Sequence, residues 1–270
     1  MELHGWGRYP RQEAQVVEPL SGQHCLRAVS GTSPLIARGL GRSYGDSALG
    51  PQVLSTRLLD QLHAFDPETG LLSCAAGTSL DDILRTFVPR GWFLPVMPGT
   101  RFITVGGAIA SDVHGKNHHR DGTFSAHVAS IRILLGNGEC VGASPSDKAE
   151  LFHATCGGMG LTGVIVSAVL RLKRIAASDI LETRIKAPSL DAVLEAFDAH
   201  AASAYSVAWI DCMARGASLG RSILVTAEPC VDGPLVARRV KAPGVPIEMP
   251  SGLLRRPLAR MVNATYYRRA

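Results

Sequence analysis

The sequence has no long hydrophobic run and no closely paired cysteines. No apolar stretch approaches the roughly 18 residues that a membrane-spanning helix requires, and the first residues lack the basic and apolar regions of a secretory signal. The six cysteines are scattered, with no C-x-x-C pair, so cysteine serves mainly as a small hydrophobic residue. These absences favour a globular protein in a reducing compartment, and we expect it in the cytoplasm.

Positive charge is concentrated near the C-terminus. Much of the net charge of +5 comes from five arginines there: Arg255, Arg256, Arg260, Arg268 and Arg269. A run of this kind is usually a solvated face, and it fits an anionic substrate as well as it fits nucleic acid. We therefore expect no nucleic-acid partner.

Short apolar segments separated by Gly, Asp and Pro predict strands between Pro34 and Leu172. "PLIARG" and "LLSCAAG" are strand-like, and "VASIRILLGNGECVGAS" is typical of a hairpin that turns at 136–138. Two short helices are predicted in "TSLDDILRTFVPRG", with Thr78 or Ser79 as the N-cap, and in "DKAELFHATCGG".

The pattern changes near Ala176 to Ser178, after the β-branched strand "LTGVIVSAVLRLKRI". A helical spacing follows in "SLDAVLEAFDAHAA", then two strand-like segments, "AYSVAWIDCM" and "SILVTAE". From Pro234 onward the sequence shows little periodicity. We predict an α+β fold in two domains, residues 1–176 and 177–270.

The first glycine loop, "RGLGRSYGDS", follows a predicted strand. A Rossmann fingerprint would need a helix directly after the glycines, and Gly50-Pro51 stands where that helix would run, so that motif is excluded. Two interpretations stay open for this loop. Its backbone N–H groups form a nest for a phosphate, or it is a tight turn that needs positive φ at Gly39 and Gly41.

Two further glycine clusters follow. "PGTRFITVGGAIASDVHGKNHH" offers backbone donors at Gly99 and 105–107, then small side chains that suit a planar ring, then a dense polar group. Three interpretations are open for its histidines: metal ligands, ordinary surface or core side chains, or hydrogen-bond donors around a cofactor or substrate. The last interpretation fits best. In the third cluster, Gly157, Gly158, Gly160 and Gly163 precede a strand, where glycine is expected if a ligand or another backbone comes close. Three such clusters at strand edges suggest one long ligand held from several sides.

Taken in order, four segments resemble the FAD-binding oxidoreductases of the vanillyl-alcohol-oxidase type, which have a PCMH-type FAD-binding domain. The segments are "ARGLGRSYGDSA", "PGTRFITVGGAIASDVHGKNHH", "LFHATCGGMGLTGVI" and "YSVAWID". "HGKNHH" is the most discriminating part, and "GWGR" near the N-terminus also fits. The resemblance is greatest to the decaprenylphosphoryl-β-D-ribose oxidases of that family.

The resemblance implies a two-subdomain PCMH-type FAD-binding domain in residues 1–176 and an incomplete antiparallel-sheet substrate cap in 177–270. Members of the family continue well past residue 270, so we expect the chain to be C-terminally truncated. The implied FAD contacts are Ala37, Arg38, Gly39, Leu40, Gly41, Arg42, Ser43, Tyr44, Gly45, Asp46, Ser47, Gly99, Thr104, Val105, Gly106, Gly107, His114, Gly115, Lys116, Asn117, His118, His119 and Ile165.

The resemblance also implies residue roles. Lys116, His114 and Tyr44 would be catalytic, and Trp209 together with Lys116 would bind substrate, with no metal involved. Relatives that attach FAD covalently have a histidine where this chain has Arg42, which implies non-covalent FAD.

The implied reaction removes hydride from C2' of a polyprenylphosphoryl ribose to flavin N5. A reductase that uses NAD(P) would then complete a ribose-to-arabinose epimerisation for cell-wall arabinan. The lipid-linked substrate would bring peripheral membrane contact. The alternatives are an aldonolactone or polyol oxidase of the same family and a non-catalytic flavin-binding module.

Overall fold

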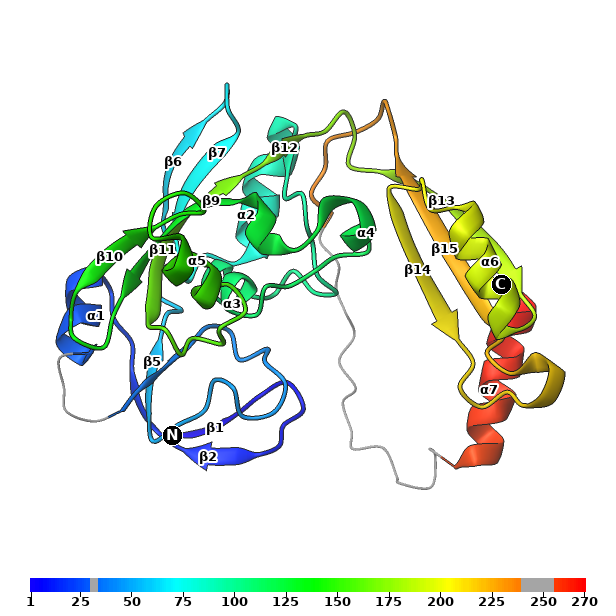
Figure 1. Cartoon of the computed structure of the whole chain (residues 1–270), viewed down its shortest axis with the longest axis horizontal. Helices are drawn as coiled ribbons and strands as arrows, with labels where there is room; N and C mark the ends of the chain where they lie inside the picture. The colour runs from blue at the N-terminus through cyan, green and yellow to red at the C-terminus, as the bar shows by residue number, and fades with distance from the viewer. Residues whose placement is uncertain (30–33, 239–254) are drawn as a thin grey trace. The chain divides into compact units, whose positions relative to one another are not determined.

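The computed structural model describes residues 1–29, 34–238 and 255–270. Within them the chain mixes helices and sheets and divides into two units, Met1–Ile175 and Ala176–Ala270 (Figure 1). No helix in these three ranges is both long and apolar enough to cross a membrane.

The first unit begins with a small parallel sheet. Strands β3 (Gln15–Val17), β5 (Gln52–Ser55) and β4 (Ile36–Arg38) lie in the order β3-β5-β4. A hairpin of β1 (Glu2–His4) and β2 (Arg11–Glu13) precedes them, and helix α1 (Gly22–Val29) follows β3. Parallel neighbours are usually joined by a crossover helix, yet residues 39–51 between β4 and β5 contain only turns and irregular backbone. The expectation that no helix follows the first glycine loop is confirmed.

A five-stranded antiparallel sheet forms the centre of this unit, in the order β10-β9-β11-β7-β6. Its strands are β6 (Leu62–Asp66), β7 (Leu71–Ala75), β9 (Val128–Leu134), β10 (Cys140–Ala143) and β11 (Val164–Arg171). The predicted hairpin is confirmed, since β9 pairs with β10 across a turn in which Gly138 has a φ of 86°. Fully buried side chains such as Leu72, Ile131 and Leu170 hold the sheet in the core.

Both helices predicted in this unit are present. Helix α2 (Leu80–Phe87) is capped by Ser79, whose Oγ accepts a hydrogen bond from the Asp82 N–H at 3.0 Å. Helix α5 (Ala149–Thr155) ends just before Gly157. The unit also contains α3 (Val105–Ala110), α4 (His118–Asp121), a pair of short strands, β8 (Trp92–Phe93) and β12 (Lys173–Arg174), and the 3-10 turns η1 (Val88–Arg90) and η2 (Phe124–His127).

The second unit is a three-stranded antiparallel sheet with a helix on each face. Strands β13 (Ile180–Ala187), β15 (Ser222–Pro229) and β14 (Tyr205–Ile210) lie in the order β13-β15-β14, and η3 (Gly216–Ser218) precedes β15. Helix α6 (Leu190–Ala199), which confirms the predicted helical spacing and is capped by Ser189, packs near Ala208 and Leu224. Helix α7 (Arg256–Arg269) contacts Trp209, the next residue along β14. Because successive strand residues point to opposite faces, the two helices cover opposite sides of the sheet.

Helix α7 lies in the stretch after Pro234, where the sequence shows little periodicity and no element was predicted. Its arginines and alanines favour a helix by propensity, and a proline near its start fits the first helical turn. Residues 239–254 of that stretch lie outside the described residues.

Candidate functional site

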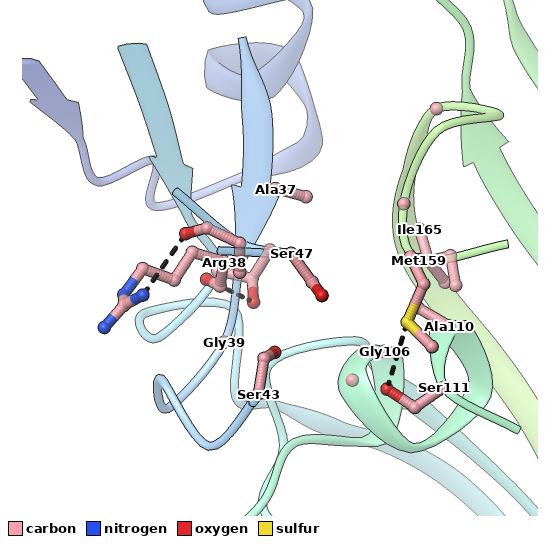
Figure 2. A pocket seen from close by; sticks show the side chains of 15 residues that line it. Ala37, Arg38, Gly39, Ser43, Ser47, Gly106, Ala110, Ser111, Met159 and Ile165 are labelled. Carbon is pink, nitrogen blue, oxygen red and sulfur yellow. Dashed lines mark hydrogen bonds between the residues drawn. The ribbon is translucent and has the colours of Figure 1, made fainter. Parts of the chain in front are cut away.

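One pocket in the first unit is lined by parts of all three glycine clusters. Figure 2 shows residues of β4 and its loop on one side, and residues of α3 and the segment leading into β11 on the other. Eight of the predicted FAD contacts line this pocket: Ala37, Arg38, Gly39, Ser43, Ser47, Gly106, Gly107 and Ile165. Its volume of about 60 Å³ is small beside the roughly 300–1,000 Å³ of a pocket for a whole small molecule. The space therefore suits one part of a long ligand.

The first glycine loop has the open backbone donors that a phosphate nest needs. The N–H groups of residues 39–48 donate to no atom of a described residue, whereas the next one, on Leu49, bonds to the Asp46 carbonyl at 2.9 Å. Gly41 has a φ of 65° and Gly45 a φ of 61°, while Gly39 has no positive φ. The tight-turn interpretation therefore holds for Gly41 and not for Gly39, and it is compatible with the nest.

The N-terminal segment packs against this loop. The Trp6 N–H donates to the Ser43 carbonyl at 2.8 Å, and a Cβ on Gly5 would lie only 2.6 Å from that same oxygen. The Arg42 guanidinium stacks 5.2 Å from the centre of the Trp6 ring. The "GWGR" segment thus fixes one wall of the loop, and close approach explains its first glycine.

Arg38 holds the other end of the loop. Its guanidinium donates to the carbonyls of Ala48 at 3.2 Å and His4 at 2.7 Å, and Figure 2 shows it pointing away from Ser111 and Met159. Burial lowers the pKa of this guanidinium, which stays charged because its pKa is very high to begin with. No carboxylate of the described residues forms an ion pair with it. A half-buried cation without a counter-ion makes the loop favourable for an anion.

The second cluster differs from the prediction, because its backbone donors are already used. Val105 and Gly106 donate to the carbonyls of Thr78 at 2.9 Å and Ala76 at 2.7 Å, and Gly107 donates to the Thr104 side chain at 3.1 Å. These residues form the first turn of α3, with Thr104 as N-cap, rather than a loop at a strand edge. The expectation of exposed donors at 105–107 is therefore wrong. Gly106 and Gly107 contribute a surface without side chains, and Ala110 and Ser111 extend it.

The third cluster is attached to the end of α3. The N–H groups of Gly157 and Met159 donate to the carbonyls of Ile109 at 3.0 Å and Ala110 at 2.8 Å. Gly163 needs its conformation for another backbone, since its φ is 147° and a Cβ there would lie 2.5 Å from the Leu134 carbonyl oxygen. Of the two explanations offered for these glycines, backbone approach accounts for Gly163 and for Gly158, where a Cβ would lie 2.2 Å from the Ala154 carbonyl oxygen. Gly160 and Gly163 also line the pocket.

The histidine and lysine group lies outside the pocket lining. His114, Lys116, His118 and His119 are all exposed, and the rings of His114 and His118 are 5.2 Å apart. Within the described ranges, no three His, Cys, Asp or Glu side chains gather as a metal site would require.

Asn117 differs from its neighbours, because it is almost fully buried. Its Nδ2 donates to the Pro95 carbonyl at 2.8 Å and also to Asp121. A Cβ on Gly115 would lie 2.6 Å from Asn117 Oδ1. Asn117 therefore fixes the backbone of the exposed histidine and lysine segment, and the missing side chain of Gly115 leaves room for the Asn117 amide.

The remaining predicted residues are placed as follows. Tyr44 is 80% exposed, and Trp209 belongs to the second unit, where its ring packs against Tyr266 of α7 at 4.9 Å. Thr104 and Val105 are buried and do not line the pocket. The other predicted contacts do not line the pocket either: Leu40, Gly41, Arg42, Gly45, Asp46 and Gly99. Their roles, and that of Trp209, stay predictions.

Several lining residues were not predicted: Ala48, Thr56, Ala110, Ser111 and Met159. Ala48, Ala110, Ser111 and Met159 carried a signal, because they lie inside the segments on which the resemblance rests. Thr56 lies outside those segments and carried none. A larger cavity of about 520 Å³ lies between α1 and the central sheet, and no predicted site residue lines it.

Comparison with known proteins identifies the domain that contains most residues of this pocket. Residues 13–144 match the model of a family described as FAD binding domain, and that range includes β4, its glycine loop and α3. Residues 13–144 are an FAD binding domain. FAD is therefore the cofactor of this part of the chain.

Curated relatives of the FAD binding domain carry enzyme names. The chain is 40% identical to decaprenylphosphoryl-beta-D-ribose oxidase of Mycolicibacterium smegmatis over 233 residues, 82% of this chain and 50% of that protein. It is 28% identical to cytokinin dehydrogenase 4 of Arabidopsis thaliana over 57% of this chain and 30% of that one. A Neurospora crassa protein provisionally named D-arabinono-1,4-lactone oxidase is 27% identical over 55% of this chain and 26% of its own. The chain thus spans about half the length of the first relative and less of the others.

Proposed function

We propose that the protein is an FAD-dependent oxidoreductase that oxidises a sugar hydroxyl, with C2' of a polyprenylphosphoryl ribose as the substrate position. The observation that carries this proposal is the 40% identity to a decaprenylphosphoryl-beta-D-ribose oxidase across most of the chain. The pocket formed by the three glycine clusters supports it from the structural side.

The residues have distinct tasks in this proposal. The backbone N–H groups of 39–48 bind the FAD pyrophosphate, with Arg38 supplying positive charge behind them, and Gly106 and Gly107 leave room for the cofactor. Bound FAD supplies the hydride acceptor. Lys116 orients the phosphorylated sugar and stabilises the developing alkoxide, and His114 accepts the hydroxyl proton.

The second unit is the substrate cap in this proposal, and the first is the PCMH-type FAD domain with its two subdomains. Trp209 lines the sugar pocket, and Tyr44 borders the substrate side. The keto sugar is then reduced by a separate NAD(P)-dependent enzyme, which completes the epimerisation.

Flavin content and flavin reduction test the proposal. Purified protein should show the visible flavin absorbance band, and acid precipitation should release all of the FAD, because Arg42 cannot form the covalent bond that a histidine forms. Under anaerobic conditions, farnesylphosphoryl ribose should bleach the band. Protein that holds FAD but is not bleached would be a flavin-binding module rather than this oxidase.

An aldonolactone or polyol oxidase is the second candidate, favoured by the similarity to the Neurospora crassa protein. Both functions use the same FAD domain and differ in the cap. Bleaching by an aldonolactone, with no response to the phosphorylated ribose, would identify this alternative.

Replacing Lys116 separates catalysis from cofactor binding. Lys116→Ala should slow single-turnover flavin reduction by about 10²-fold or more, the usual scale for loss of a positioned charged group, while the FAD content stays unchanged. Lys148→Ala is the matched control, since Lys148 is also exposed, precedes α5 and is not part of the predicted site. An unchanged rate in Lys116→Ala would remove this lysine from the reaction.

A further inference from the structure

Helix α7 is attached to the second unit by one side only. Asn263 Nδ2 donates to Asp211 Oδ1 at 2.7 Å, and Lys186 Nζ donates to the Arg268 carbonyl at 3.0 Å. The Tyr266 ring contacts Trp209, and the Tyr267 ring lies 5.0 Å from the Arg221 guanidinium. These contacts fix which side of the helix faces the sheet.

Asp211 is the main polar contact on the side of α7 that faces the sheet. Asp211 is almost fully buried and also accepts two hydrogen bonds from Arg221, at 2.9 and 2.7 Å. Burial alone would raise the pKa of the Asp211 carboxyl, but its hydrogen bonds with Asn263 and Arg221 outweigh burial and lower the pKa. Asp211 is therefore ionised at neutral pH and keeps α7 in a fixed rotation.

The opposite side of α7 combines apolar and basic side chains. Met261 and Val262 are 60% and 55% exposed, and Arg268 and Arg269 lie two helical turns further on, so all four project from the side away from Asn263. Arg260 is exposed at the border. More than half of each of these two large apolar residues is therefore open to solvent in the described part of the chain.

No acidic residue occurs between Arg255 and Ala270, although five arginines do. None of these arginines forms an ion pair with a described residue. The outer side of α7 is therefore a concentrated, uncompensated positive surface around an apolar strip.

We propose that the outer side of α7 binds the surface of a membrane that contains anionic phospholipid. Arginines at the headgroup level with apolar side chains directed into the acyl boundary are the combination that an interfacial helix uses. Nucleic acid would use the arginines and leave Met261 and Val262 in water, so the exposed apolar pair favours the bilayer. The inference complements the proposed function, in which the substrate carries a polyprenyl chain, but vesicle binding can be measured without turnover.

Vesicle co-sedimentation of the FAD-loaded protein tests this inference. The protein should sediment with phosphatidylcholine vesicles that contain phosphatidylglycerol, should not sediment with pure phosphatidylcholine, and should be released by high salt. The triple variant Arg260→Gln, Arg268→Gln, Arg269→Gln should bind at least about tenfold more weakly, because each arginine near an anionic surface contributes about fivefold.

A charge-matched control uses exposed arginines of the first unit. Arg27→Gln, Arg57→Gln, Arg132→Gln removes the same charge and should sediment like wild type. Met261→Gln, Val262→Gln should weaken binding while leaving all arginines in place. Equal losses in the two triple variants, or unchanged binding in both α7 variants, would overturn the proposal. So would retention on duplex DNA with no vesicle binding, which would assign the arginines to nucleic acid.

Discussion

Gly39 is the point where the first glycine loop touches α3. A Cβ on Gly39 would lie 2.3 Å from Thr104 Oγ1 and 3.0 Å from Thr104 Cγ2. Thr104 could give way only by rotating its side chain, which would break its cap bond with the Gly107 N–H. Packing against Thr104 therefore requires glycine at position 39, independently of any ligand.

Gly39→Ala should therefore both destabilise the protein and impair FAD retention. We expect a loss of about 1–3 kcal/mol, as for other overpacked sites, and at least a tenfold weaker FAD affinity, measured by thermal unfolding and flavin titration. Gly136→Ala is the control, because a Cβ at Gly136 would meet no atom within 4 Å. If Gly39→Ala retains wild-type FAD affinity, the loop geometry does not determine cofactor binding.

The thiol of Cys74, in the middle of the central sheet, predicts a pH dependence of stability. Burial raises the pKa of this thiol to about 12, whereas an exposed thiol has a pKa near 8.5. Above about pH 8.5 the unfolded chain loses this proton and the folded chain keeps it, so the contribution to stability is complete below that pH and falls as pH rises. At pH 10 the loss is about 2 kcal/mol.

Cys74→Ala should thus show a shallower fall in unfolding free energy between pH 8 and 10 than wild type, measured by urea denaturation at each pH. The comparison of slopes removes the cost of the smaller side chain, which is the same at every pH. Cys140→Ala, at an exposed strand end, controls for the loss of a thiol. Parallel slopes for Cys74→Ala and wild type would show that Cys74 does not titrate differently in the folded state.

At the scale of elements, two helix caps of the same kind serve different helices. Thr104 caps α3, whose residues line the pocket, and Ser79 caps α2, whose residues do not. The two caps are neighbours that pair in an antiparallel bridge, so a difference between them reports on the helix rather than on the location. Each side chain accepts one hydrogen bond from the first turn of its helix, so loss of either should cost about 1 kcal/mol.

Thr104→Val and Ser79→Ala should therefore lower stability to a similar extent, while only Thr104→Val weakens FAD binding. Valine keeps the shape of threonine against Gly39, so the difference reports on the position of α3. Urea denaturation and flavin titration of both variants give the two quantities. A loss of FAD affinity in Ser79→Ala equal to that in Thr104→Val would mean that general stability, rather than α3, governs retention.

The sequence predicted the elements whose local signals agree with their surroundings. Helices α2, α5 and α6 have apolar residues at helical spacing, and Ser79 and Ser189 mark two of their starts. Helix α3 was not predicted, because its sequence VGGAIA places two glycines in the first turn, where glycine disfavours a helix. Tertiary hydrogen bonds from its first two N–H groups to Thr78 and Ala76 compensate for that preference.

The difference between local signals and tertiary contacts also explains which parts of the candidate site could be predicted. Motif resemblance identified the segments that meet, because glycine clusters are visible in sequence, and the structure brings all three to one pocket. It could not show which donors were free, since the bonds that occupy the 105–107 donors come partly from Ala76 and Thr78, about 30 residues earlier in the chain. Thr56 reaches the pocket through the pairing of β5 with β4, since its N–H donates to the Arg38 carbonyl at 2.8 Å, and neither segment's sequence shows that pairing.

At the scale of the whole molecule, every residue that lines the pocket lies between Ala37 and Ile165, inside the first unit. Residues at the end of that unit are held by it: the Ile175 N–H donates to the Gly91 carbonyl at 2.9 Å, and the Arg174 guanidinium stacks 4.4 Å from the centre of the Trp92 ring. The first unit thus contains its own core and closes its own C-terminal end.

A fragment of residues 1–175 should therefore fold and retain FAD, with an affinity within about tenfold of the longer chain. It should not be bleached by farnesylphosphoryl ribose, because Trp209 and the rest of the proposed cap are absent. Flavin absorbance of the purified fragment and anaerobic reduction measure the two properties separately. A folded fragment without FAD would show that the second unit contributes to cofactor binding, and a fragment reduced as fast as the longer chain would show that the second unit is not the substrate cap.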